Sequence, residues 1–220
     1  MLSAENLAGI ESEGRRLGLA ARRDPHRSVP QYPGWTLADL VNLTASIHGR
    51  TAQICRELPA ERISSPKLPE GTDPVDWYEE TLDDMLAALT EADPASECWA
   101  FGPRPNVGFW ERRMVIETGI HRWDAYQALG EEDRLTDLVA RSGLDEVPDM
   151  WLRQAGDVQT LRATATDLEE SWVFGQGDPT ASVDGTASDL YLSIVSRPSL
   201  VDLPPDWAAA VRGLAPPPKP

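Results

Sequence analysis

The stretch RRMVIETGIHRWDAYQAL, residues 112–129, decides the fold class, because its apolar residues recur with the period of a long amphipathic helix. Its inward-facing stripe also carries two ionisable side chains, Glu117 and His121, four residues apart. Side chains at this spacing lie on one face of a helix and can point at one spot. A buried carboxylate is costly unless it is paired, hydrogen-bonded or bound to a metal, so the pair marks this helix as a candidate site.

Three more long helices are predicted around this one, over residues 3–23, 37–58 and 74–92. Connections rich in proline and glycine separate them, and Ser3 is the expected N-cap of the first. Four long helices with ordinary connections predict a four-helix bundle.

The predicted helix over residues 37–58 has a histidine within its apolar stripe. Thr36 and Asp39 have the spacing of a capping box, with Asp in place of the usual Glu, which fixes where this helix begins. His48 then falls among the inward-facing residues. His26 lies in a polar connection, so two of the three histidines of the chain lie on the inward stripes of two helices.

After Gly130 the sequence changes in character, and short segments with strand-like residues and turn-forming neighbours follow. These predicted strands lie within residues 160–167, 171–177 and 181–185. TASDLYLSIVSR, residues 186–197, predicts a helix that begins near Thr186.

These elements predict an α+β protein with two domains. We expect a four-helix bundle over residues 1–145 and a small α+β domain over residues 146–220. The last residues, APPPKP at 215–220, have the composition of a disordered tail.

Composition excludes several partners. The net charge of the 220-residue chain is −16, which disfavours nucleic acid and anionic lipid as partners. We find no run of 18 apolar residues and no apolar N-terminal segment of the signal-peptide kind, so we expect no membrane partner. The two cysteines, Cys55 and Cys98, form neither a disulfide framework nor a CxxC metal motif, which fits a reducing cytoplasm.

His48, Glu117 and His121 together form a His₂Glu set. Three protein ligands with an open fourth position are typical of catalytic zinc, and bundle cores build metal sites in this way. Two simpler interpretations stay open, because Glu–His pairs at this spacing are common on exposed helices and a lone inward histidine is often a hydrogen-bonded core residue. Asp124 is placed to orient His121 or a neighbouring arginine, or else to face solvent.

Three segments resemble a known family, the mycothiol-dependent maleylpyruvate isomerases. VPQYPGWTLADLVNLTASIH, residues 29–48, is similar to the family's opening motif, although Tyr32 replaces a motif cysteine. RRMVIETGIHRWDAYQALG, residues 112–130, resembles the more specific RRMxxExxxHRWDxxxAxG helix. LRATATDLEESWVF and VDGTASDLYLSIVSR resemble the family's smaller second domain, so the likeness covers nearly the whole chain.

The resemblance implies a DinB-like four-helix bundle followed by a small α+β domain, with His48, Glu117 and His121 as ligands of a divalent metal, usually zinc. It also implies a low-molecular-weight thiol, mycothiol in actinobacteria, which the metal holds as a thiolate that attacks a small electrophile. An isomerase would release this thiol again, whereas an S-transferase would leave it attached. Arg197 matches the family's anion-binding arginine in the second domain, whereas the helix over 74–92 has no arginine to match the one in the bundle.

We therefore expect a cytoplasmic, metal- and mycothiol-dependent isomerase or S-transferase. Two other functions would use the same three ligands. An open metal site can activate water for hydrolysis, and turnover would then need no added thiol. A non-catalytic protein would use the metal pocket to bind a metabolite or as a structural clamp.

Overall fold

A computed structural model describes residues 4–155 and 157–212 of the chain, which divides into two compact units between Arg134 and Leu135. The predicted N-cap Ser3 and the predicted tail at 215–220 lie outside the described residues. The predicted domain boundary, between residues 145 and 146, falls inside helix α5 of the second unit.

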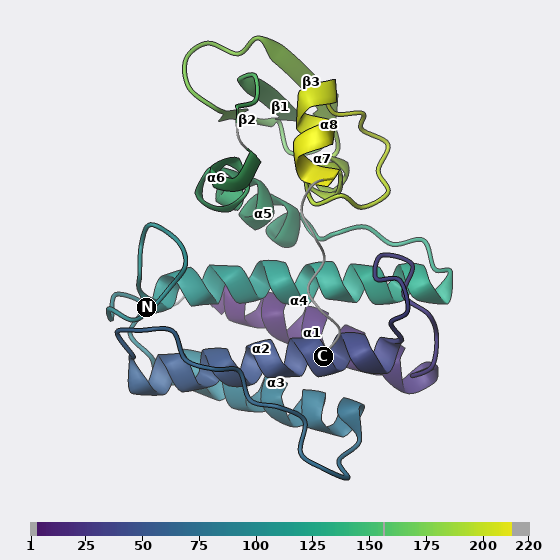
Figure 1. The fold of residues 1–220 in the computed structure, drawn as a ribbon, viewed down its shortest axis with the longest axis vertical. Coiled ribbons are helices and arrows are strands. Elements are labelled where there is room, and N and C mark those ends of the chain that lie inside the picture. Colours follow the sequence, from purple (N-terminus) through teal and green to yellow (C-terminus); the bar gives the residue numbers. More distant parts are fainter. Residues whose placement is uncertain (1–3, 156, 213–220) are drawn as a thin grey trace. The chain divides into compact units, whose positions relative to one another are not determined.

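The first unit is the predicted four-helix bundle (Figure 1). Its helices are α1 (Ala4–Arg23), α2 (Leu37–Glu57), α3 (Pro74–Glu91) and α4 (Val107–Leu129). α2 packs against α3, and α1 packs against α4, while α2 and α4 also touch. The bundle therefore brings together the two helices that carry the candidate ligands.

Capping residues determine the start of α2 and both ends of α4, the two helices that carry the candidate site. The expected capping box at the start of α2 is present, because the Thr36 side chain accepts from the Asp39 backbone and Asp39 accepts from the Thr36 backbone N–H at 2.8 Å. α4 begins after Asn106, whose side chain accepts from the backbone N–H of Phe109. It ends at Gly130, whose φ of 76° is the left-handed conformation that glycine adopts without strain.

α4 is buried on more faces than one stripe would require. Beyond the predicted inward stripe, Val115, Ile116 and Ile120 are also buried, as is the charged Arg122. A helix that is buried around most of its circumference carries few solvent-facing positions, so it differs from the one-sided amphipathic helix that its sequence predicts.

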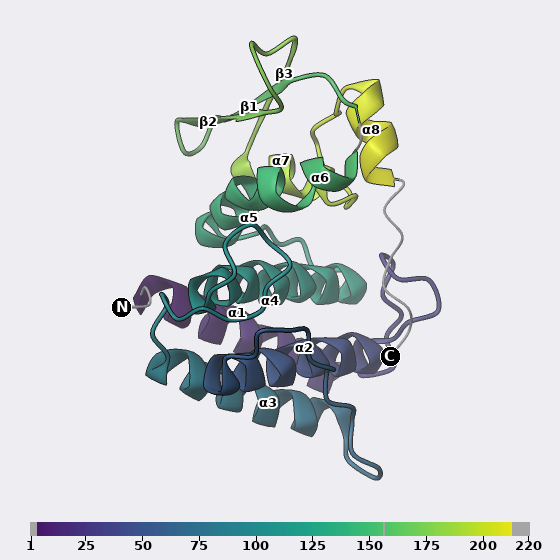
Figure 2. The same ribbon diagram turned by 60° about the vertical axis from the view of Figure 1, so that its left-hand side comes forward.

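The second unit contains a three-stranded sheet (Figure 2). Its strands are β1 (Leu161–Ala165), β2 (Glu170–Phe174) and β3 (Ala181–Gly185), in the order β2-β1-β3. β1 pairs antiparallel with β2 and parallel with β3. Alternate residues of β1, Leu161, Ala163 and Ala165, are buried, and α7 packs against β1 and β3. The predicted strands and the predicted α+β class are confirmed.

Helices complete this unit. α7 (Ala187–Ile194) begins next to Thr186, as predicted, with the Thr186 side chain as its N-cap, and it ends three residues before the predicted end at Arg197. Sequence patterns did not predict α5 (Asp137–Met150), α6 (Leu152–Ala155) or α8 (Pro205–Arg212).

The proline and glycine within α5 explain why that helix was missed, since both residues normally argue against a helix interior. Pro148 lies in the last turn of α5. Gly143 lies where α5 meets α7, because a Cβ atom at this position would come within 2.5 Å of the Tyr191 ring.

Within residues 4–155 and 157–212, no helix combines the length and apolar character needed to cross a bilayer.

Candidate functional site

The structure brings Glu117 and His121 into direct contact, as their spacing predicts. Oε1 of Glu117 lies 3.0 Å from Nε2 of His121, and both side chains are almost fully buried. The other oxygen of Glu117 accepts a hydrogen bond from Arg113, one turn earlier on α4. The carboxylate therefore lies between a guanidinium and an imidazole.

Asp124 lies behind His121. Its Oδ2 is 3.3 Å from Nδ1 of His121, and the Asp124 side chain is completely buried rather than facing solvent. The structure therefore has Asp124 in the position that orients the imidazole of His121, and not in the solvent-facing one. Both ring nitrogens of His121 consequently have carboxylate neighbours.

These contacts set the charges of the pair. Burial opposes a charged imidazole, but hydrogen bonds to Asp124 and Glu117 outweigh it and raise the pKa of His121. Burial likewise opposes a charged carboxylate, but Arg113 and His121 outweigh it and lower the pKa of Glu117. Glu117 is therefore ionised at neutral pH.

His48 faces α4 from α2 with one ring nitrogen unused. Its Nε2 lies 3.0 Å from the Thr118 hydroxyl, which is adjacent in sequence to Glu117. Its Nδ1 is buried and has no hydrogen-bond partner among the described residues. Burial lowers the pKa of His48 to about 3, with Glu117 and His121 as its charged neighbours, so the imidazole is neutral and able to donate a lone pair.

The three residues fit a divalent metal in donor chemistry. Two imidazoles and one carboxylate are ligands that zinc takes in catalytic sites, and the unpaired Nδ1 of His48 is a buried polar atom that needs a partner. In the described part of the chain, however, no three or more His, Cys, Asp and Glu side chains are grouped closely enough to hold a metal ion. Glu117 and His121 bind each other and Arg113 instead, so a metal would have to replace those contacts.

Aromatic side chains lie next to His121 and His48. The Tyr32 ring is 6.0 Å from the His121 ring and stacks on Trp35 at 4.9 Å, both distances between ring centroids. The Tyr78 ring lies 5.5 Å from the His48 ring. Tyr32, which stands where the resembling family has a motif cysteine, is thus a buried wall residue of the candidate site.

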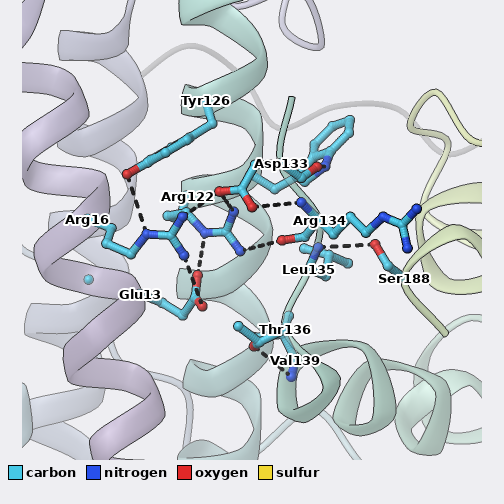
Figure 3. A network of polar contacts seen from close by, with 12 residues as sticks. Glu13, Arg16, Arg122, Tyr126, Asp133, Arg134, Leu135, Thr136, Val139 and Ser188 are labelled. Carbon is cyan, nitrogen blue, oxygen red and sulfur yellow. Dashed lines mark hydrogen bonds and ion pairs between the residues drawn. The ribbon is translucent and has the colours of Figure 1, made fainter. Parts of the chain in front are cut away.

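A buried ion network holds α4 against α1, and nothing in the sequence pattern indicated it. The guanidinium of Arg122, which is completely buried, donates to Glu13 of α1, to Asp133 at 2.7 Å and to the backbone carbonyl of Arg134 at 2.9 Å (Figure 3). Arg16 of α1 donates to the same Asp133 carboxylate. Since Arg122 follows His121 directly, this network fixes the position of the helix segment that carries Glu117 and His121.

Sequence reasoning also missed Arg50, which lies two residues after His48 on α2. Its Cζ atom is 5.9 Å from the centroid of the Trp99 ring and 5.5 Å from that of Trp110. Burial and the neighbouring Arg62 lower the pKa of Arg50, while Glu117 raises it and Arg113 lowers it by smaller amounts, so Arg50 lies within electrostatic reach of the candidate site. Arg50 lies on α2 and Trp99 in the connection before α4, so their contact follows from the fold and not from a local sequence pattern.

The two cysteines are not reactive thiols. Cys55 and Cys98 are 6% and 5% exposed. Burial raises the pKa of Cys55 to about 12 and also raises that of Cys98. Neither side chain provides a thiolate at neutral pH.

Arg197, the predicted anion contact, lies in the second unit just after α7. It lines a pocket of about 390 Å³ together with Ser193, Ser196 and Ser199, and its guanidinium donates to the backbone carbonyl of Val195 at 2.9 Å. The side chain is half-buried.

Comparisons with known proteins identify the family of the helical bundle. The family model described as the mycothiol maleylpyruvate isomerase N-terminal domain matches residues 8–126. A search of curated proteins found no match.

Two solved structures have a similar fold. A crystal structure of mycothiol-dependent maleylpyruvate isomerase has a TM-score of 0.69 at 14% identity, with 89% of this chain and 90% of that chain covered. A histidine-to-alanine mutant of the isomerase has a TM-score of 0.67 at 15% identity, with 86% and 87% covered. Because the family model spans more than half of the sequence, this chain belongs to the mycothiol maleylpyruvate isomerase N-terminal domain family.

Proposed function

We propose that this protein is a divalent-metal-dependent and mycothiol-dependent isomerase or S-transferase that acts on a small electrophile. The ligands would be His48, Glu117 and His121, and the metal would be zinc. The observation that carries the proposal is the buried donor set, in which Nδ1 of His48 has no partner among the described residues while Glu117 and His121 meet at 3.0 Å.

The cysteines favour a thiol that comes from outside the protein. Thiol chemistry needs a thiolate, yet both protein thiols are buried and have raised pKa values. A bound divalent metal would supply the missing activation by lowering the pKa of a thiol held at the site. The family's name and the similar structures indicate mycothiol as that thiol.

The residues of the chain would divide the remaining tasks. Neutral His48 and ionised Glu117 offer lone pairs, and Asp124 holds the ring of His121 in place through its Nδ1. Tyr32 and Trp35 exclude water from the side of His121. We also propose that Arg197 contacts an anionic group of the substrate, as its half-burial beside three serines allows.

The experiment is metal analysis of the purified protein, followed by titration of the metal-free protein with zinc and then with mycothiol. We expect one zinc per chain, lost in His48→Ala, Glu117→Gln and His121→Ala. His26→Ala is the matched control, because His26 is exposed and lies outside the site. Unchanged zinc binding in all three ligand variants would overturn the proposal.

Turnover assays separate the remaining functions. A reaction that requires mycothiol supports the isomerase or transferase, and product analysis tells the two apart by whether the thiol stays attached. Hydrolysis without any thiol would instead assign the site to a metal-dependent hydrolase.

A further inference from the structure

Polar side chains of α2 and α4 meet beside the candidate ligands. Nε2 of His48 lies 3.0 Å from the Thr118 hydroxyl. One turn further along each helix, the Thr51 hydroxyl lies 3.4 Å from the sulfur of Met114. All four side chains are completely buried. Because Thr118 follows Glu117 directly, its hydroxyl ties His48 of α2 to the helix that carries the other two candidate ligands.

The imidazole of His48 has a single proton to place. The ring is completely buried and forms no ion pair with a carboxylate in residues 4–155 and 157–212, so it is neutral and has one N–H and one lone pair. Nε2 has the Thr118 hydroxyl as its partner, whereas Nδ1 has no partner among the described residues.

The two possible positions of this proton differ in what they leave unsatisfied on the ring. A proton on Nδ1 would be a buried donor without an acceptor, and such N–H groups are rarer in proteins than acceptors with an unused lone pair. A proton on Nε2 finds the Thr118 oxygen, because a threonine hydroxyl accepts as well as donates. The geometry therefore favours the proton on Nε2.

His121 is supported in a comparable way by a different group. Its Nδ1 lies 3.3 Å from Asp124, and its Nε2 faces Glu117 at 3.0 Å. A metal-binding histidine generally donates its other ring N–H to an acceptor that fixes the tautomer and the orientation of the ring. Asp124 has this position beside His121, and Thr118 has it beside His48.

We propose that Thr118 is a positioning residue that fixes the tautomer of His48. Nε2–H of His48 donates to the Thr118 hydroxyl, so the lone pair of Nδ1 is the one that the ring offers to a metal. Thr118 is not itself a ligand. The inference rests on the proposed function, because it names the group that prepares one of the proposed ligands.

The test determines the tautomer in the full chain without metal, so it depends on neither zinc nor turnover. The chain has three histidines, and their ring resonances in a nitrogen-15-labelled sample can be assigned with His26→Ala and His48→Ala. Long-range proton–nitrogen correlation spectra distinguish protonated from unprotonated ring nitrogens. We expect the proton on Nε2 of His48 in the wild type and in Thr118→Ser. Thr118→Val keeps the shape of threonine but has no acceptor, so both tautomers should be populated.

Zinc titration of the same samples gives a second measurement. Thr118→Val should bind zinc about tenfold more weakly than the wild type, and Thr118→Ser should restore the affinity. Thr44→Val is the matched control, because Thr44 is completely buried one turn before His48 and its hydroxyl donates to the backbone carbonyl of Leu40 at 2.9 Å. This variant should keep both the tautomer and the zinc affinity.

Three results would overturn the inference. These are a proton on Nδ1 of His48 in the wild type, an unchanged tautomer in Thr118→Val, and an equal loss of zinc affinity in Thr44→Val. The two proposals also fail separately. A tautomer that depends on Thr118 in a protein that binds no zinc removes only the metal site, whereas zinc binding with a tautomer that is independent of Thr118 removes only the role of Thr118.

Discussion

Nδ1 of His121 lies 3.3 Å from Oδ2 of Asp124, and both side chains are buried on α4. The carboxylate leaves the other ring nitrogen, Nε2, facing Glu117. This hydrogen bond selects the ring orientation that a metal would need, and it does so from within a single helix turn.

Replacing Asp124 with Asn should therefore weaken zinc binding without removing a ligand. We expect a loss of about 10- to 100-fold in affinity, the range found for residues that orient metal-binding histidines. Zinc titration of the metal-free protein measures it, and Asp84→Asn on the surface of α3 serves as control. An unchanged zinc affinity in Asp124→Asn would show that His121 needs no support or is not a ligand.

Replacing Arg113 should instead strengthen zinc binding. Its guanidinium bonds the Glu117 carboxylate and would compete with a metal for it. Arg113→Gln is expected to strengthen zinc binding by about tenfold, since a charge-assisted hydrogen bond no longer has to be given up. The same titration checks this, with Arg56→Gln for comparison, and weaker zinc binding would mean that Arg113 assists the ligand rather than competes with the metal.

The ion network around Arg122 predicts a large effect on stability. Arg122→Ala leaves the buried carboxylate of Glu13 with only the longer ion pair to Arg16 at 4.0 Å, so the free energy of unfolding should fall by about 3–5 kcal/mol. Arg15→Ala removes an exposed pair with Asp83 and should cost about 1 kcal/mol or less. Urea denaturation followed by circular dichroism compares the two variants, and similar losses would contradict a special role for the buried pair.

Both thiols should resist modification in the native protein. Cys55 and Cys98 are buried and have raised pKa values, so a thiol-specific disulfide reagent at pH 8 should label neither until denaturant is added. Absorbance of the released thiolate counts the reactive groups. Rapid labelling of one cysteine in the folded protein would reopen the possibility that the chain supplies its own nucleophile.

The bundle could be predicted from sequence because its signals are local. Apolar periodicity located all four long helices, and the capping box at Thr36 and Asp39 fixed the start of α2. The short strands and α7 were recognised in the same way. α5 could not be, since Pro148 and Gly143 break the local rule while packing against α7 supports the helix.

In the candidate site, too, contacts between residues close in the sequence could be predicted, and contacts between distant residues could not. The contact between Glu117 and His121 follows from a spacing of four residues, and so does the position of Asp124 from a spacing of three. The partners of Arg122 and the indoles around Arg50 lie far away in the sequence, and no periodic pattern encodes such pairs. Whether His48 joins Glu117 and His121 around a metal remains a prediction, carried by the donor set and the family.

His121 of the candidate site and Arg122, which holds α4 against α1, are adjacent in sequence. Successive residues of a helix point about 100° apart, so His121 and Arg122 project in different directions. The anchoring contacts of Arg122 with α1 therefore do not depend on what surrounds the face that bears Glu117 and His121. Substitutions on the face that bears Glu117 and His121 would therefore leave the contacts that hold α4 against α1 in place.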